Sequence, residues 1–262
     1  MKIEHFLDEL WSDYISITPI AKTINNLLEC RGEHILNDHI ALRTFAHENC
    51  SKERFVKFFE QFGYKLCQEY NFVEKKLEAV HLENRANPLL PKIFISELLY
   101  DQLPDDCITI INREIKRVEH LEVEELFSKK DIFKISYKEY QRLYSHSEYA
   151  AWLCSVGFRP NHFTINVNQL KTVESILELN SLLKDNGVIL NSSGGEVKGS
   201  PDVFLEQSST MADQIEVRFD DEVKEVPSCY YEFAYRYKLQ NGKLFQGFVA
   251  NSADKIFEST NE

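Results

Sequence analysis

The stretch NDHIALRTFAHENCSKERFVKFFEQFGYKL, residues 37–66, has a counterpart in PNHFTINVNQLKTVESILELNSLLKDNGVIL, residues 160–190. Each stretch opens with a short alternating strand that begins near a histidine, His39 or His162. A polar joint follows in each, and then an amphipathic helix with its apolar residues on one face. Identity between the two stretches is thin, so their common layout predicts an internal repeat.

The spacing within the two copies supports the repeat. Both helices end at a glycine, Gly63 or Gly187, which suits a left-handed C-terminal cap. From histidine to glycine there are 24 residues in the first copy and 25 in the second. After each helix the chain is expected to form strands, and in the second copy these are DVFLEQSS, QIEVRF and SCYYEFAYRY. The intervening SSGGEVKGSP, residues 192–201, is interpreted as a mobile loop that could cover a cavity.

These patterns predict an α+β fold in which two β-α-β-β-β modules form a mixed barrel with added helices. Residues 1–30 and the connection between the modules also have helical patterns. We expect one domain over residues 1–262, because no long Pro-, Gly- or Ser-rich linker separates the halves. Its expected parts are module one at about 34–100, a helical connection at about 101–158 and module two at about 159–258.

Composition narrows the class of protein. The formal charge of −12 disfavours a nucleic-acid partner and an anionic membrane surface, since both are bound through clustered Lys and Arg. No run of about 18 apolar residues is present to span a bilayer. The first residues do not have the pattern of a signal peptide, and the six cysteines are scattered without a CxxC pair. We therefore expect a cytoplasmic protein with reduced thiols.

The alternating strands carry the candidate chemistry. Side chains alternate between the two faces of a strand, so the polar face of each strand meets water or lines a cavity. Open sheets with one solvent-exposed face are common, so for any strand taken alone a polar face that meets water is the favoured interpretation. However, His39 and His162 occupy equivalent positions of the repeat, and Glu232 lies among aromatic residues in the last strand. Two imidazoles and one carboxylate are typical of a non-haem Fe(II) site, which leaves other positions open.

Arg43 lies four residues beyond His39 on the same strand face, about 13 Å away at roughly 3.3 Å per residue. Its planar guanidinium suits bidentate binding of a substrate carboxylate at the far end of a cavity. A structural ion pair with one of the many acidic residues explains the spacing equally well.

Four motifs together resemble a known family: NDHIALRTF, RPNHFTINV, SCYYEFAYRY and GFVANSADKIFES. They are similar to the 2-oxoadipate dioxygenase/decarboxylase family, whose members have a vicinal-oxygen-chelate-like barrel, and the resemblance covers about residues 30–258. It implies that His39, His162 and Glu232 are metal ligands and that Arg43 binds substrate in the active site. It also implies that Asn251 and Ser252 contact the distal carboxylate of the substrate.

The reaction implied by this resemblance is Fe(II)-dependent conversion of 2-oxoadipate and O2 to 2-hydroxyglutarate and CO2. An Arg placed away from the metal would select a 2-oxo dicarboxylic acid over a monoacid. The chain is shorter than the long members of the family, and its NSADK tail differs from theirs, which leaves the native substrate of this short form open. The oligomeric state is also open.

Two other functions remain possible interpretations of the sequence. One is a different metal enzyme on the same barrel, an isomerase, lyase or hydrolase that uses Mn, Ni or Zn. The other is a protein that binds a small acid without catalysis. The polar cluster from Gln207 to Thr210 is expected to form a turn, and lining of the pocket is the alternative interpretation. His34, His47, His81 and His146 have no partners at ligand spacing and are expected to be surface or structural residues.

Overall fold

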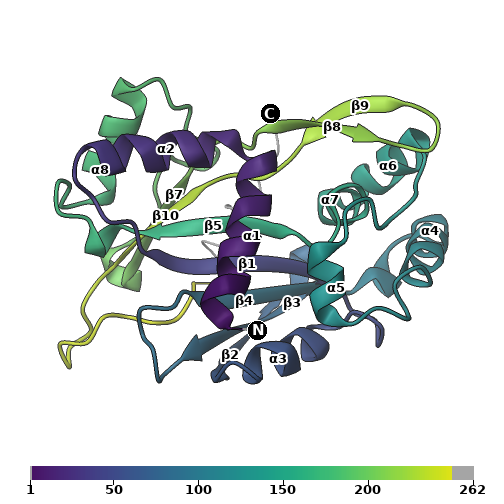
Figure 1. Cartoon of the computed structure of the whole chain (residues 1–262), viewed down its shortest axis with the longest axis horizontal. Coiled ribbons are helices and arrows are strands. Elements are labelled where there is room, and N and C mark those ends of the chain that lie inside the picture. The colour runs from purple at the N-terminus through teal and green to yellow at the C-terminus, as the bar shows by residue number, and fades with distance from the viewer. Residues whose placement is uncertain (1, 250–262) are drawn as a thin grey trace.

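The computed structural model describes residues 2–249 (Figure 1). Its helices are α1 (Ile3–Ile17), α2 (Pro19–Cys30), α3 (Lys52–Glu60), α4 (Asp105–Ile115), α5 (Val123–Ser128), α6 (Tyr137–Tyr144), α7 (Glu148–Val156) and α8 (Ile176–Asp185). Its strands are β1 (Asn37–Phe45), β2 (Tyr64–Phe72), β3 (Leu77–Asn84), β4 (Lys92–Leu98), β5 (Pro160–Asn166), β6 (Lys198–Ser200), β7 (Leu205–Ser209), β8 (Gln214–Arg218), β9 (Val223–Pro227) and β10 (Glu232–Arg236). Short 3-10 helices cover Val73–Lys75, Tyr100–Gln102, Val167–Gln169 and Pro201–Val203.

Eight strands form one curled sheet in the order β2-β3-β4-β1-β5-β10-β7-β6 (Figure 1). The two halves of this order match. In one half β1 is parallel to β4, and in the other half β5 is parallel to β10. The two outer strands of each half, β3 and β2 or β7 and β6, pair antiparallel with their neighbours. The halves meet where β1 pairs antiparallel with β5. The predicted repeat and the mixed α+β fold are therefore confirmed.

The strands of the second module differ in part from the prediction. QIEVRF forms β8, which pairs only with β9 in a separate two-stranded sheet. The third strand of the module is instead β6, a three-residue edge strand inside the segment that was interpreted as a loop. The alternation of polar and apolar residues does not show which sheet a strand joins. β8 alternates like a strand with one solvent-exposed face, and such a strand can belong to the main sheet or to a separate one.

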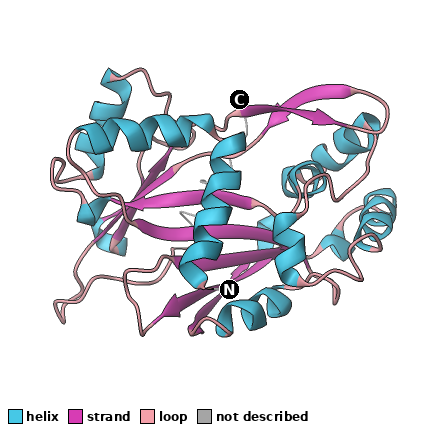
Figure 2. Cartoon of the chain, viewed as in Figure 1, coloured by secondary structure: helices cyan, strands magenta, loops and turns pink. Residues whose placement is uncertain are grey.

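Helix α1 crosses the face of the sheet opposite the cavity described below (Figure 2). Phe6, Leu10 and Tyr14 lie three or four residues apart and are all buried, which is the pattern of an amphipathic helix. The Tyr14 ring lies 4.9 Å from that of Phe163 on β5, and its hydroxyl donates to the carbonyl oxygen of Tyr230 at 2.6 Å. The N-terminal helix therefore supports the strands that carry the candidate site.

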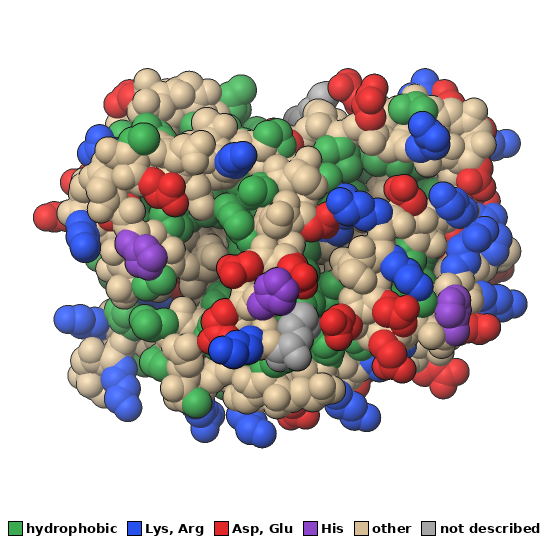
Figure 3. Space-filling view, in the orientation of Figure 1, with side chains coloured by type: hydrophobic (Ala, Val, Ile, Leu, Met, Phe, Trp, Pro, Cys, Tyr) green, Lys and Arg blue, Asp and Glu red, His purple; other side chains and the backbone are tan. Residues whose placement is uncertain are grey.

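The helical connection between the modules is α4 to α7, and it covers one end of the sheet (Figure 1). Ser136 and Glu139 form a reciprocal capping box at the start of α6. Acidic and basic side chains both occur across the face shown in Figure 3. Among residues 2–249, helices of the length and apolarity needed to cross a bilayer are absent.

Candidate metal centre

The register of three neighbouring strands aligns the residues of the centre. On β1 and β5, His39 lies opposite Thr164, and Thr164 in turn lies opposite Glu232 on β10. His162 lies two residues before Thr164, so it projects from the same face of β5. Because Thr164 is small, the side chains of His39 and Glu232 can meet above it. All four residues are buried.

The two histidines and the glutamate that the sequence predicted as metal ligands come together. One potential ligand atom of each lies within 4.8 Å of the other two. The Nε2 atoms of His39 and His162 are 3.4 Å apart, and they lie 3.3 and 3.6 Å from the two carboxylate oxygens of Glu232. Residues distant in the chain therefore converge in one buried cavity.

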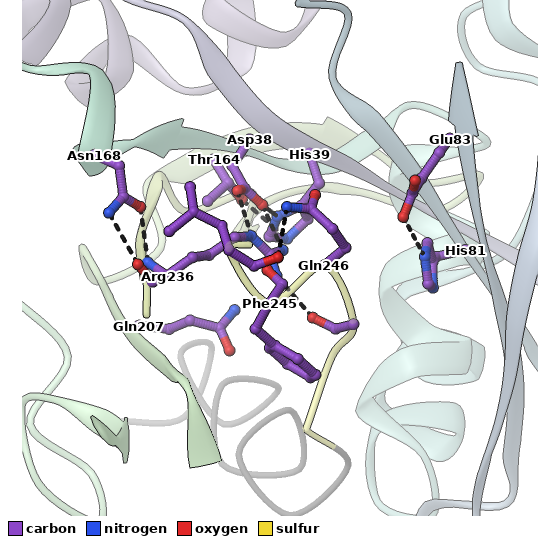
Figure 4. A network of polar contacts seen from close by, with 12 residues as sticks. Asp38, His39, His81, Glu83, Thr164, Asn168, Gln207, Arg236, Phe245 and Gln246 are labelled. Atoms are coloured by element: carbon purple, nitrogen blue, oxygen red, sulfur yellow. Dashed lines mark hydrogen bonds and ion pairs between the residues drawn. The ribbon is translucent and has the colours of Figure 1, made fainter. Parts of the chain in front are cut away.

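The far side of each imidazole ring is fixed by the residue that precedes it. Nδ1 of His39 lies 2.8 Å from Asp38 Oδ1 (Figure 4). Nδ1 of His162 lies 3.1 Å from Asn161 Oδ1. A ring that donates its Nδ1 proton to these acceptors presents the lone pair of Nε2 on the other side. Two such lone pairs and a carboxylate then face one another. This donor set fits a divalent cation.

The pKa directions agree with this arrangement. Burial lowers the pKa of His162 to about 3, so its ring is neutral despite the adjacent carboxylate. Burial also opposes the charged form of His39, but hydrogen bonds to Asp38 and Glu232 outweigh it and raise the pKa. For Glu232, burial favours the neutral acid, yet the electrostatic interaction with the adjacent His162 ring and the hydrogen bonds with His39 and Gln207 lower the pKa. The lowered pKa favours the ionised carboxylate, which suits Glu232 to bind a cation.

Two further side chains hold the Glu232 carboxylate. Gln207 Nε2 donates to Oε1 at 2.7 Å, and Thr164 Oγ1 lies 3.3 Å from the same oxygen (Figure 4). The expectation of a turn at Gln207 was wrong, because this residue lies in strand β7 and lines the cavity. The strand expected over DVFLEQSS is thus confirmed for LEQSS, and the pairing of β7 with β10 brings Gln207 next to Glu232.

The repeat also explains why the centre has one carboxylate. Thr164 lies two residues after His162, as Ala41 does after His39, and their partners in the next parallel strand are Glu232 and Phe94. Phe94 therefore occupies the position in module one that Glu232 has in module two. An apolar ring at this place lines the cavity without offering a ligand.

Arg43 lines the same cavity as His39 and is 1% exposed. Helix α7 positions its guanidinium, which lies 4.7 Å from the ring of Tyr149 and 5.0 Å from that of Trp152. Its Nη1 is 3.5 Å from Glu148 Oε1. Arg43 therefore faces the cavity and also contacts an acid, and its binding of a substrate carboxylate stays a prediction.

The sequence interpretation missed a buried ion pair beside the centre. Arg236 Nε and Nη2 donate to the two oxygens of Asp38 at 2.6 and 2.8 Å. The same guanidinium donates to the carbonyl oxygens of Phe245 and Gly247 (Figure 4). A signal was present, since Asp38 stands before His39 as Asn161 stands before His162. The ion pair links this position to the end of the described chain.

The residues predicted to bind the distal carboxylate, Asn251 and Ser252, lie outside the described residues. Just before them, Phe248 packs its ring edge against His39 at 4.8 Å and forms one wall of the cavity. The prediction that His81 is a residue without partners at ligand spacing was wrong. His81 is buried, and its ligand atoms lie close to those of Cys67 and Glu83.

Comparison with known proteins gives a consistent result. The sequence model of the family described as 2-oxoadipate dioxygenase/decarboxylase matches residues 16–134 and 122–245. A rice protein named 2-oxoadipate dioxygenase/decarboxylase, chloroplastic/amyloplastic, is 38% identical over 94% of this chain and 75% of its own.

Solved structures are similar over nearly the whole chain. The rice hydroxyglutarate synthase in complex with 2-oxoadipate is 36% identical, with a TM-score of 0.89 over 98% of this chain and 91% of that one. A protein from Shewanella frigidimarina, described provisionally as a hydrolase, is 44% identical, with a TM-score of 0.90 over 95% and 98% of the two chains. A Ralstonia eutropha protein described provisionally as a member of the glyoxalase superfamily shares the fold at 18% identity, with a TM-score of 0.77 over 92% of this chain and 83% of that one.

Proposed function

The chain belongs to the 2-oxoadipate dioxygenase/decarboxylase family, and we propose that it converts a 2-oxo dicarboxylic acid, with 2-oxoadipate as the first candidate, and O2 to a 2-hydroxy acid and CO2. For 2-oxoadipate the product is 2-hydroxyglutarate. The observation that carries the proposal is one buried cavity that holds two histidine Nε2 atoms, a carboxylate and, farther along β1, a guanidinium.

His39, His162 and Glu232 would hold the metal, and we propose Fe(II). Two imidazoles and one carboxylate are the ligand set of many non-haem iron oxygenases. When bound, the ion supplies a site for the 2-oxo acid and for O2 together with the redox chemistry of the reaction. Asp38 and Asn161 keep the two rings in the required tautomer, and Gln207 holds the carboxylate.

Arg43 would bind the carboxylate of the substrate that lies away from the metal. It stands four residues from His39, so roughly 13 Å of strand separate the two backbone positions. Both side chains line the same cavity. The contact with Glu148 orients the guanidinium before substrate binds. A diacid would thereby be preferred over a monoacid, because only a diacid reaches both ends.

The walls of the cavity would keep water from the reacting atoms. Phe94, Tyr230 and Phe248 present rings to it, and the Tyr230 ring lies 4.7 Å from that of His162. Apolar walls strengthen the electrostatic attraction between the substrate carboxylates and their partners. They also limit side reactions of any short-lived species.

The proposal is tested by oxygen consumption. Metal-free protein is reconstituted with Fe(II) under anaerobic conditions, and O2 uptake and 2-hydroxyglutarate are then measured with 2-oxoadipate. We expect equal molar amounts of O2 consumed and product formed. His39→Ala should abolish both, whereas the matched variant His120→Ala, at an exposed position, should retain them.

Two results would reject the proposal. If wild-type protein consumes no more O2 than His39→Ala, with 2-oxoadipate or its shorter and longer homologues, the oxygenase assignment fails. If turnover of a 2-oxo acid proceeds without O2, the chain is a different metal enzyme on this fold.

A further inference from the structure

A second group of metal-ligating side chains lies on strands β2 and β3. Cys67 comes from β2, and His81 and Glu83 come from β3. One ligand atom of each lies within 4.8 Å of the other two. His81 is 2% exposed, whereas Cys67 and Glu83 are half-buried. Solvent can therefore reach the group, while one of its members is fixed in the interior.

Local backbone structure brings the three side chains together. His81 and Glu83 are two residues apart on a strand and so share a face. The register between β2 and β3 shifts between Leu66 and Gln68, which places Cys67 in a bulge. A bulge changes the direction of the side chain it carries, and here it brings the thiol to the face of β3 that holds the imidazole.

His81 is oriented like a metal-binding histidine whose second ring nitrogen is hydrogen-bonded to a neighbouring side chain. Its Nδ1 lies 2.8 Å from the hydroxyl oxygen of Tyr70, and its Nε2 lies 3.3 Å from Glu83 Oε1. Figure 4 shows His81 and Glu83 pointing toward each other, apart from the group around His39. A histidine that binds metal through one nitrogen usually donates its other N–H to an oxygen acceptor, and Tyr70 provides one.

We propose that Cys67, His81 and Glu83 bind a thiophilic divalent cation of the zinc type. Thiolate, imidazole and carboxylate are all common zinc ligands, and three of them leave a fourth position for water. Ligand atoms around a tetrahedral zinc ion are about 3.3–3.7 Å apart, as follows from bond lengths of about 2.0–2.3 Å. The separation of 3.3 Å between His81 Nε2 and Glu83 Oε1 already matches, and rotation of the half-buried Cys67 side chain brings its sulfur to the same spacing.

Neighbouring charge selects the type of ion. Lys92 lies close enough to interact electrostatically with both Glu83 and Cys67. Its ammonium group opposes a hard cation that is held by charge alone, such as Mg²⁺ or Ca²⁺. A soft ion gains additional bonding to sulfur, so the thiolate favours zinc over these hard ions.

The proposed site is connected to the candidate metal centre through one tyrosine. The hydroxyl oxygen of Tyr70 accepts a hydrogen bond from the backbone N–H of Phe248 at 3.1 Å. The Phe248 ring lies against His39 at 4.8 Å and 5.3 Å from that of His81. A cation on His81 Nε2 would fix the proton on Nδ1 and so fix the bond to Tyr70. Occupancy of the second site would thereby hold Phe248 in place over the cavity.

Cobalt(II) titration of the metal-free full chain under reducing conditions tests the proposal. Cobalt occupies zinc sites, and a thiolate ligand gives it an intense near-ultraviolet charge-transfer band. The residues of the first centre include no sulfur, so this band reports the second site alone. We expect the band in wild type and in Glu232→Ala, and in Glu232→Ala, which has lost a ligand of the first centre, its intensity should saturate at one equivalent. Zinc should displace the cobalt and remove the band.

The variants make the test specific. Cys67→Ser should lose the band, and Glu83→Gln should weaken cobalt binding at this site by about tenfold or more. Cys30→Ser, which alters an exposed cysteine outside the proposed site, should retain the band. Circular dichroism of each variant establishes that it is folded. Absence of the band in wild type, or an unchanged band in folded Cys67→Ser, would overturn the proposal. Neither result depends on oxygenase activity, so the two proposals can fail separately.

Discussion

Replacing Asp38 by Asn removes one charge from a buried pair while keeping the shape of the side chain. Asp38 accepts two hydrogen bonds from Arg236, at 2.6 and 2.8 Å, and lies 2.8 Å from Nδ1 of His39. Both Asp38 and Arg236 are at most 3% exposed. The substitution therefore acts on the stability of the fold and on the metal centre together.

The expected loss of stability comes from Arg236. Removing one partner of a buried ion pair costs about 3–5 kcal/mol, because the other charge is left buried without compensation. Arg236 keeps its hydrogen bonds to the carbonyl oxygens of Phe245 and Gly247, so we expect a value near the lower end, about 3 kcal/mol. His39 also loses its carboxylate partner. Loss of such a partner lowers metal affinity by about 10- to 100-fold.

Two measurements check these values. Urea unfolding of the metal-free protein gives the change in stability, and a competition titration with a chelator gives the change in metal affinity. Asn161→Ala is the matched control, because it removes the acceptor of His162 without breaking an ion pair. It should lower metal affinity with a stability loss of only about 1 kcal/mol. An Asp38→Asn protein within about 1 kcal/mol of wild type would refute the reasoning about the buried charge.

The pH dependence of the same variant provides a second check. Burial alone would raise the pKa of Asp38, but the charge and hydrogen bonds of Arg236 hold it well below the usual 3.8. The carboxylate thus stabilises the fold fully above about pH 4, and the contribution is lost as pH falls through the folded-state pKa. The stability difference between wild type and Asp38→Asn should stay constant from neutral pH to about pH 4 and narrow only below it.

Three further outcomes are expected. Glu232→Gln removes the anionic member of the proposed ligand set His39, His162 and Glu232, so the variant should lose its metal on gel filtration, and metal content equal to wild type would contradict this. Arg43→Lys should lower kcat/KM for a dicarboxylic 2-oxo acid by about 10- to 100-fold, because the bidentate contact is lost, with a smaller effect on a monocarboxylic 2-oxo acid. An equal effect on both acids would exclude a role in binding the distal carboxylate. Burial lowers the pKa of His162 to about 3, below the 6.5 of the unfolded chain, so its neutral form destabilises the metal-free protein increasingly as pH falls below about 6.5. In His162→Gln the urea midpoint should therefore decline less steeply between pH 6.5 and 3 than in wild type. If the two plots of urea midpoint against pH are parallel, the lowered pKa of His162 is refuted.

The repeat was predictable from the sequence because it rests on local features. The capping glycines Gly63 and Gly187 both adopt the positive φ that the pattern required, 87° and 80°. The alternation of side chains on β1 placed His39 and Arg43 on one face, and both residues line the cavity. These features depend on residues near one another in the chain, where strand and helix periodicity determine which side chains share a face.

The convergence of the centre was decided by strand pairing. Nothing in the segment LEQSS indicates that Gln207 contacts Glu232, and the sequence of β8 does not show that this strand leaves the main sheet. A change of one residue in register would move a strand's side chains to the opposite face. Such choices depend on contacts between distant segments, so local patterns could not supply them.

By itself, the sequence therefore determined the two modules, the equivalence of their histidines and the shared face of His39 and Arg43. Tertiary structure alone decided that His39, Thr164 and Glu232 align across three strands, that Asp38 is paired with Arg236, and that Cys67 approaches His81. The physical reason is that periodicity acts within a segment, whereas the distance between two side chains on different strands is set by register, bulges and packing.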